Sequence, residues 1–122
     1  MPIQSYQDLE VWQRGMTIAE QVYSLTRPFP REEMFGLTSQ MRRAASSIPA
    51  NIAEGWGRMG TKEFQRFLQI AMGSLRELET HLLLSQRIGL PKMEQIQPIL
   101  ESSTILGKQI LSLIRSLEKR SN

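Results

Sequence analysis

Four long segments of this chain repeat apolar residues every three or four positions, and only short breaks separate one segment from the next. This spacing matches the period of an α-helix that buries one face. Proline or glycine stands in each break, and both residues end helices. We therefore expect four helices, over residues 5–26, 31–56, 61–88 and 92–119. No run of alternating β-branched residues predicts a strand.

The short connections restrict how these helices can be arranged. At 1.5 Å per residue, helices of about 22 to 28 residues are roughly 33 to 42 Å long. A connection of a few residues cannot lead the chain back along that length, so sequential helices must be antiparallel neighbours. We predict an all-α fold, an antiparallel up-down-up-down four-helix bundle that forms a single domain over residues 1–122.

Composition narrows the class of protein. The chain has 122 residues, a formal net charge of +3 and no cysteine. Without cysteine there is no disulfide, thiol nucleophile or cysteine-ligated zinc, and a cytoplasmic location is expected. No apolar run approaches the roughly 18 residues that a membrane span needs, and the start of the chain lacks the apolar block of a secretory signal. The positive charge permits nucleic-acid binding without requiring it.

The first helical segment carries two apolar rows. The row expected to face the core consists of Leu9, Trp12, Met16, Ala19, Val22 and Tyr23. The second row consists of Val11, Ile18 and Leu25, and the fourth segment has a similar outer row at Ile105, Leu111 and Ile114. A helix buried on one side normally shows one stripe. Either the core contact is broad, or the outer rows join copies of the chain in a homo-oligomer through the first and fourth helices.

Pro49 stands inside the second helical segment, in the stretch QMRRAASSIPANIAEGWG over residues 40–57. A proline in a helix interior costs about 3 kcal/mol, so tertiary packing should require it. Small residues surround Pro49, and Gly73 and Ser74 lie at the antiparallel level of the third segment. We therefore expect the second and third helices to cross closely at this point.

The stretch MRRAASSIPANIAEGWGR, followed by EFQRFLQIAMGSLRELETHL, resembles the four-helix-bundle family first noticed as open reading frames in intervening sequences of bacterial 23S rRNA genes. The similarity extends from residues 6–13 through 29–40 to 87–90, and its most specific block is SIPANIAEG over residues 47–55. The resemblance implies an antiparallel bundle that assembles into a cyclic homo-oligomer, such as a pentamer, and implies no enzyme activity. Related bundles accompany the reverse transcriptases of diversity-generating retroelements, where contact with nucleic acid is expected.

Residues that commonly carry chemistry are sparse. His81 is the only histidine, and Glu77 and Glu79 are its nearest carboxylates in the sequence. A di-metal bundle needs Glu-x-x-His on two helices together with further carboxylates, which one histidine cannot supply. No nucleophile-elbow or phosphate-loop sequence is present. We expect no metal, no cofactor and no enzyme activity.

Basic residues gather near the connection between the second and third helices. They are Arg42, Arg43, Arg58, Lys62 and Arg66. They could neutralise phosphates, and Trp56 could stack on an unpaired base. Alternatively, the cations form a solvated face with pairs such as Glu63–Arg66, and Trp56 caps the core. If Glu54 is buried, it needs a partner among Arg43, Arg58 and Arg66.

Two hypotheses for function follow. The first is a non-enzymatic homo-oligomer that binds RNA or DNA through this basic patch. The second is a structural or adaptor bundle that binds a protein partner, such as a reverse transcriptase, and has no direct role on nucleic acid. Neither hypothesis involves a membrane.

Overall fold

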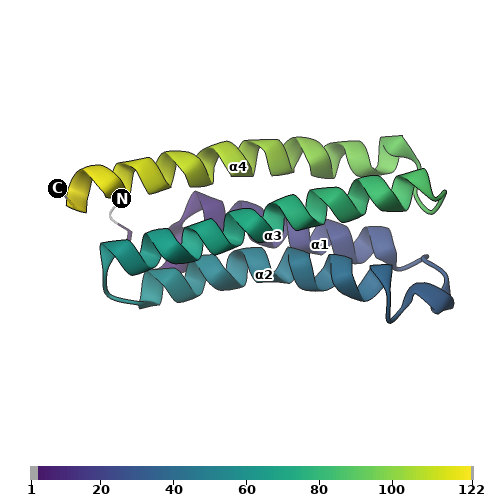
Figure 1. Cartoon of the computed structure of the whole chain (residues 1–122), viewed down its shortest axis with the longest axis horizontal. Coiled ribbons are helices and arrows are strands. Elements are labelled where there is room, and N and C mark those ends of the chain that lie inside the picture. The colour runs from purple at the N-terminus through teal and green to yellow at the C-terminus, as the bar shows by residue number, and fades with distance from the viewer. Residues whose placement is uncertain (1–2, 122) are drawn as a thin grey trace.

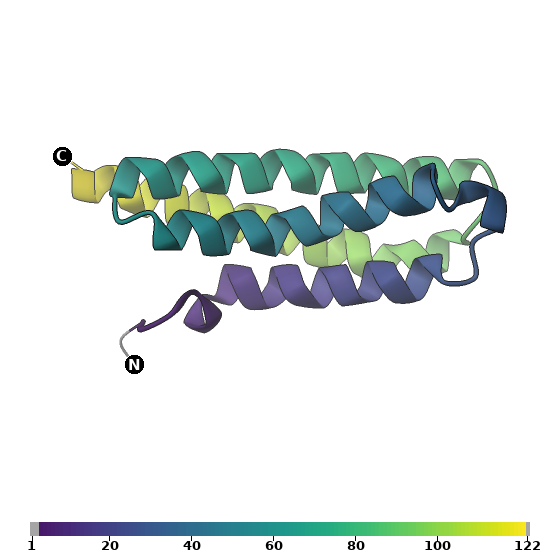
Figure 2. The same cartoon turned by 90° about the horizontal axis from the view of Figure 1, so that it is seen from below.

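The computed structural model describes residues 3–121. It contains the helices α1 (Glu10–Thr26), α2 (Leu37–Gly57), α3 (Thr61–Arg87) and α4 (Met93–Ser121). Single 3-10 turns, η1 (Tyr6–Asp8) and η2 (Arg31–Glu33), precede α1 and α2. Over residues 3–121 there is no strand. Each helix lies beside the next one along the chain and runs antiparallel to it (Figure 1). Figure 2 shows α1 and α3 on opposite sides of the bundle. The predicted antiparallel four-helix bundle is confirmed.

The first helix begins later than expected. Residues 5–9, which were expected to be helical, form the separate turn η1, which is closed by its own side chains. The Ser5 hydroxyl accepts a hydrogen bond from the Gln7 N–H at 3.1 Å, and the Asp8 carboxylate accepts one from the Ser5 N–H at 3.2 Å. Leu9 is then extended, so α1 starts at Glu10. Short polar side chains that bond to nearby backbone compete in this way with a continuous helix.

The second helix also begins later, at Leu37 instead of residue 31. Glu33 was expected in the first helical turn and instead lies before the helix, at the end of η2. Its carboxylate accepts a hydrogen bond from the Leu37 N–H at 3.3 Å. The carboxylate therefore still satisfies a donor at the start of the helix, although from outside it.

The end of α2 and both ends of α3 lie close to the residues predicted from the sequence. Gly60 precedes α3, so Thr61 is its first helical residue and not its N-cap. At the other end of α3, Gly89 has a φ of 88°, and its N–H donates to the Gln86 carbonyl. The Leu90 N–H donates to the Ser85 carbonyl. These two bonds form a Schellman motif, in which glycine adopts the left-handed conformation at low cost.

The buried side of α1 takes residues from both of the rows that the sequence distinguishes. Val11 and Ile18 are buried together with Val22, whereas Met16 and Tyr23 are 39% and 42% exposed. The expected assignment was therefore wrong for Val11, Ile18, Met16 and Tyr23, whereas Leu9 and Val22 of the expected core row are buried as predicted. Both rows have the helical period, so the period alone does not decide which of their side chains are buried. On α4, Ile114 is buried and belongs to the core, while the other two members of its expected outer row, Ile105 and Leu111, are exposed.

The centre of α2 contacts two neighbours, α1 through Pro49 and α3 through Ser47. Pro49 is buried and faces α1: a Cβ atom added to Gly15 would lie 3.4 Å from the Pro49 Cδ atom. Toward α3, Ser47 and Ser74 share a hydrogen bond of 2.9 Å between their hydroxyl oxygens, so this part of the expected crossing is present. Gly73 takes no part in it, because it is exposed and has open space where a Cβ atom would be.

Gly55 marks the closest approach of α2 to α3. A Cβ atom on Gly55 would lie 2.6 Å from the Phe67 Cβ atom and 3.1 Å from the Phe64 Cδ1 atom. Real Cβ atoms do not approach each other so closely, and therefore only glycine allows the two helices to meet here. This contact lies in the last turn of α2, and it positions the connection to α3.

Candidate nucleic-acid interface

Two of the predicted cations lie on one aromatic ring near the α2–α3 connection. The guanidinium carbons of Arg58 and Arg66 lie 5.2 Å and 4.6 Å from the centroid of the Phe67 ring. Each arginine also pairs with a carboxylate three or four residues before it in the chain. Arg58 donates to Glu54 at 2.8 Å, and Arg66 donates to Glu63 at 2.9 Å. The structure therefore brings these two arginines together but balances the charge of each with a neighbouring glutamate.

Glu54 is not buried, so the condition under which it would need a partner is not met. Its side chain is 52% exposed, and its partner among the three arginines considered is Arg58. The pairing of Glu63 with Arg66 shifts the pKa values of both groups. The hydrogen bond from Arg66 holds the pKa of Glu63 below its ordinary value, and the same bond raises the pKa of Arg66. Glu63 and Arg66 both carry their charges in this pair at neutral pH.

Trp56 lies at the edge of an open hollow at this end of the bundle. The hollow has a volume of about 750 Å³, and Met59, Leu117 and Arg120 also line it. The Trp56 indole meets the Phe64 ring edge-on, with 6.0 Å between centroids and 83° between planes. It is partly buried, so one part of it caps the core while another part faces the hollow. The core contact of Trp56 is therefore present, and its stacking on a base stays a prediction.

Arg120 is a cation that sequence reasoning missed. It belongs to the last turn of α4 and is exposed, and the antiparallel arrangement brings this turn to the α2–α3 connection. Lys62, in the first turn of α3, is exposed as well. The signal that could have found Arg120 is topological, because in an up-down bundle the end of the fourth helix lies at the same end as the second connection.

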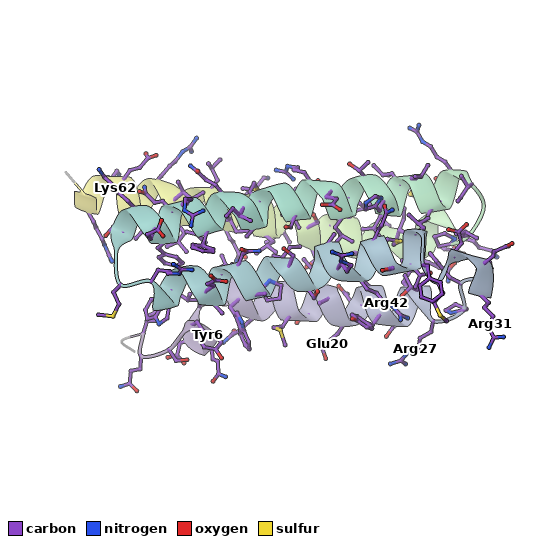
Figure 3. All side chains as sticks on the ribbon, turned by 60° about the horizontal axis from the view of Figure 1, so that its bottom comes forward. Tyr6, Glu20, Arg27, Arg31, Arg42 and Lys62 are labelled. Carbon is purple, nitrogen blue, oxygen red and sulfur yellow. The ribbon has the colours of Figure 1, made fainter. Side chains whose placement is uncertain are left out.

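Arg42 and Arg43 lie apart from this group. Sixteen residues of helix separate Arg42 from Arg58, which is about 24 Å at 1.5 Å per residue. Arg42 and Lys62 accordingly lie far apart along the bundle in Figure 3. The Arg42 Nε donates to the Thr26 hydroxyl at 2.9 Å, and its guanidinium lies 4.6 Å from the centre of the Tyr23 ring. Arg42 therefore joins α2 to α1, and the single five-cation patch predicted from the sequence is not formed.

Arg43 is exposed and lines a shallow polar groove between α2 and α3. Ser47, Ser74 and Glu77 line the same groove. A carboxylate beside Arg43 reduces the positive potential of this groove, and no aromatic side chain lines it. Arg43 is thus separate from the Trp56 hollow in both position and surroundings.

Other chemistries find little support in residues 3–121. No three side chains of the histidine, cysteine, aspartate or glutamate type gather there as metal ligands. His81 contacts Glu77 at 3.4 Å, while Glu79 pairs with Arg76 at 2.9 Å and accepts a hydrogen bond from Ser103. Among the helices of this part of the chain, none is both long and apolar enough to cross a bilayer.

Comparison with known proteins adds a solved structure. The chain is similar to a protein of unknown function from the S23 ribosomal protein family of Bacteroides thetaiotaomicron, whose crystal structure is known at 1.70 Å resolution. The two chains are 28% identical and superpose with a TM-score of 0.79, over 86% of this chain and 95% of the other. No significant match is found among curated proteins.

A family comparison agrees with both the fold and the sequence resemblance. The model of the 23S rRNA-intervening sequence proteins matches residues 7–112, which include all of α1, α2 and α3 and most of α4. This family has no known function and is not a known enzyme family. The chain therefore belongs to the family of 23S rRNA-intervening sequence proteins.

Proposed function

We propose that this protein is a non-enzymatic homo-oligomer that binds single-stranded nucleic acid, RNA in particular, at the α2–α3 end of the bundle. The observation that carries the proposal is the hollow in which Trp56 and Arg120 face the same space, with Lys62 exposed on the neighbouring turn of α3. An aromatic side chain can stack on a base of any identity, worth about 1–3 kcal/mol per base. Exposed cations beside it can neutralise the adjoining phosphates.

Self-assembly would strengthen this interaction. One subunit has a formal net charge of only +3, and two of its cations at this end are paired with glutamates. A cyclic assembly repeats the Trp56 hollow once per subunit, so that one RNA strand can contact several subunits at once. Several weak contacts on one strand raise the apparent affinity through the effective concentration of the later sites.

The test is a salt titration of binding to a fluorescently labelled single-stranded RNA. Lys62→Ala combined with Arg120→Ala should weaken binding and flatten the plot of log affinity against log salt by about 0.7 per lost phosphate contact. The control is Arg31→Ala combined with Arg87→Ala, which removes two exposed cations near the other end of the bundle. The proposal fails if the protein binds no RNA at low salt, or if both double variants behave alike.

Stacking of Trp56 on a base can be tested separately by fluorescence, because the chain has only two tryptophans. In a Trp12→Phe variant, Trp56 is the sole indole, and stacking on a base should quench its fluorescence as RNA is added. Fluorescence that stays constant while the labelled RNA binds would remove Trp56 from the interface and leave a purely electrostatic one.

A substitution of Glu63 is expected to strengthen RNA binding, whereas the substitutions of Lys62 and Arg120 should weaken it. Glu63→Gln removes the carboxylate that pairs with Arg66, so RNA binding should become tighter and more sensitive to salt. Glu32→Gln makes the same change of charge in η2 and should leave binding unchanged. A tighter complex for both variants would indicate that only the total charge matters.

A second candidate function, an adaptor that binds a protein partner, is favoured by one observation. Phe35 is 94% exposed beside Met34, which is 51% exposed, in the connection between η2 and α2. Large apolar side chains so exposed often mark protein contacts. A defined protein that co-purifies in fixed stoichiometry, and is lost with Phe35→Asp while RNA binding persists, would support this candidate. Co-purification that is unchanged by Phe35→Asp would count against it.

A further inference from the structure

We propose that the outer face of α4 from one copy of this chain docks into the groove between α1 and α2 of the next copy. This inference deepens the self-assembly part of the proposed function and rests on it. It assigns the two surfaces that meet, the direction in which the helices cross, and the charged pairs between them.

The two walls of the groove differ in the size of their side chains. The α1 wall has the large side chains Trp12, Met16 and Tyr23, whereas the α2 wall opposite has Pro49 and Ala50. The resulting hollow has a volume of about 620 Å³. A groove with an apolar floor and small residues on one side can receive the ridge of another helix.

Two charges on α1 flank the exposed Tyr23 in this groove. Glu20 and Arg27 both line it and are seven residues apart, so they share a face at a distance of about 10.5 Å along the helix. Both point away from the bundle on the same side of α1 in Figure 3. Within residues 3–121, the structure has no hydrogen bond or ion pair from either side chain, unlike the pairs Glu54–Arg58 and Glu63–Arg66.

The outer face of α4 also carries an acidic residue followed seven residues later by a basic one, in the same order along the chain as Glu20 and Arg27. Glu101 and Lys108 are seven residues apart and exposed, and between them lies Ile105, which is 45% exposed. Glu101 accepts one weak hydrogen bond, from Gln97 at 3.3 Å. The Lys108 ammonium has no ion-pair partner among the described residues.

Matching these two patterns selects one direction of approach. If α4 of the second copy runs antiparallel to α1, its Lys108 meets Glu20, its Glu101 meets Arg27, and its Ile105 meets Tyr23. In the parallel direction, Glu101 would face Glu20 and Lys108 would face Arg27. Like charges placed opposite each other exclude that direction.

The chain cannot make this contact with itself. Its own α4 lies on the other side of α1, where Arg14 donates hydrogen bonds to Gln109 and Ser102. The groove and the α4 face are two different surfaces, so every copy that accepts a helix still offers one. Such a heterologous contact closes into a ring when the rotation between copies permits. The groove is also a poor match for nucleic acid, because Glu20 balances Arg27.

The experiment measures the mass of the assembly by light scattering during gel filtration. The wild type should elute as a multiple of 14.0 kDa. Glu20→Lys and Lys108→Glu should each raise the concentration at which the assembly dissociates at least tenfold. The double variant Glu20→Lys with Lys108→Glu should restore assembly, because it re-forms the pair with reversed charges. Glu32→Lys, an exposed charge reversal in η2, is the matched control.

Ile105→Asp tests the apolar part of the contact. Ile105 lies outside the core, so this variant should fold with an unchanged circular dichroism spectrum while losing the assembly. An assembly that survives Ile105→Asp would overturn the docking of α4.

The remaining outcomes separate this inference from the proposed function. A monomeric wild type would refute self-assembly and the inference with it. A wild-type oligomer that is unaffected by the single reversals, or is not rescued by the double variant, would refute the inference alone. A defined partner protein lost with Glu20→Lys while the oligomer stays intact would assign the groove to that partner instead. RNA binding is measured on the same samples, and Lys62→Ala should leave the mass unchanged.

Discussion

Gly15 and Gly55 are both buried glycines in the interior of a helix, yet they differ in what surrounds them. A Cβ atom on Gly55 would lie 2.6 Å from the Phe67 Cβ atom, which is fixed to the backbone of α3. The same atom on Gly15 would lie 3.4 Å from Ile48 Cγ2 and Pro49 Cδ, an ordinary contact distance. The α2–α3 contact therefore requires glycine, whereas the α1–α2 contact only permits it. The tighter contact is the one beside the candidate interface.

The largest effect is expected from Gly55→Ala. The added methyl group cannot be accommodated unless α2 and α3 separate, and overpacking of this kind should lower the free energy of unfolding by about 3 kcal/mol. Urea denaturation measures this loss. Gly57→Ala is the control, because a Cβ atom on Gly57 would meet nothing within 4 Å in the same last turn of α2. Equal midpoints for the two variants would show that the tight contact is not needed.

Pro49→Ala should have the next largest effect. The substitution restores a helix hydrogen-bond donor, but it removes a buried ring that contacts α1, where about 0.8 kcal/mol is gained per buried methylene. We expect a net loss of about 1 kcal/mol, despite the better helix propensity of alanine. Differential scanning calorimetry measures this change. A higher melting temperature would show that α2 merely tolerates its proline.

Gly73→Ala should stabilise the protein. The sequence suggested a close crossing at this position, but Gly73 is exposed and its Cβ position is open. Replacing an exposed glycine in a helix interior should raise the free energy of unfolding by about 0.8 kcal/mol. Destabilisation, measured by the same urea titration, would mean that a neighbour approaches Gly73 after all.

The smallest effect is expected from Gly15→Ala, which completes the comparison. The gain in helix propensity should exceed the cost of a 3.4 Å contact, leaving a net stabilisation of about 0.5 kcal/mol. Combined with Pro49→Ala, it should recover part of that variant's loss, because the new methyl group enters the space that the ring vacated. Strictly additive free energies in this double-mutant cycle would show that the two positions are not coupled.

Much of the candidate interface was accessible from the sequence. Lys62 and Trp56 are found where the short, glycine-rich connection predicts them, and Arg58 and Arg66 lie beside them. Arg42 was misplaced, because nearness in the sequence does not limit distance along a helix that rises 1.5 Å per residue. Arg120 was missed for the converse reason, since residues far apart in the sequence meet at the end of an antiparallel bundle.

The sequence by itself determined the number of helices and their antiparallel order, because helical periodicity and the glycines and prolines that end helices are local properties. Only the tertiary structure decided which residues of the two apolar rows in the first helical segment are buried, since both rows have the same period and either could face a core. It also decided that Gly55 and not Gly73 is the point of close approach. Such choices depend on which surfaces the neighbouring helices present, and packing between helices lies outside what a single helical period encodes.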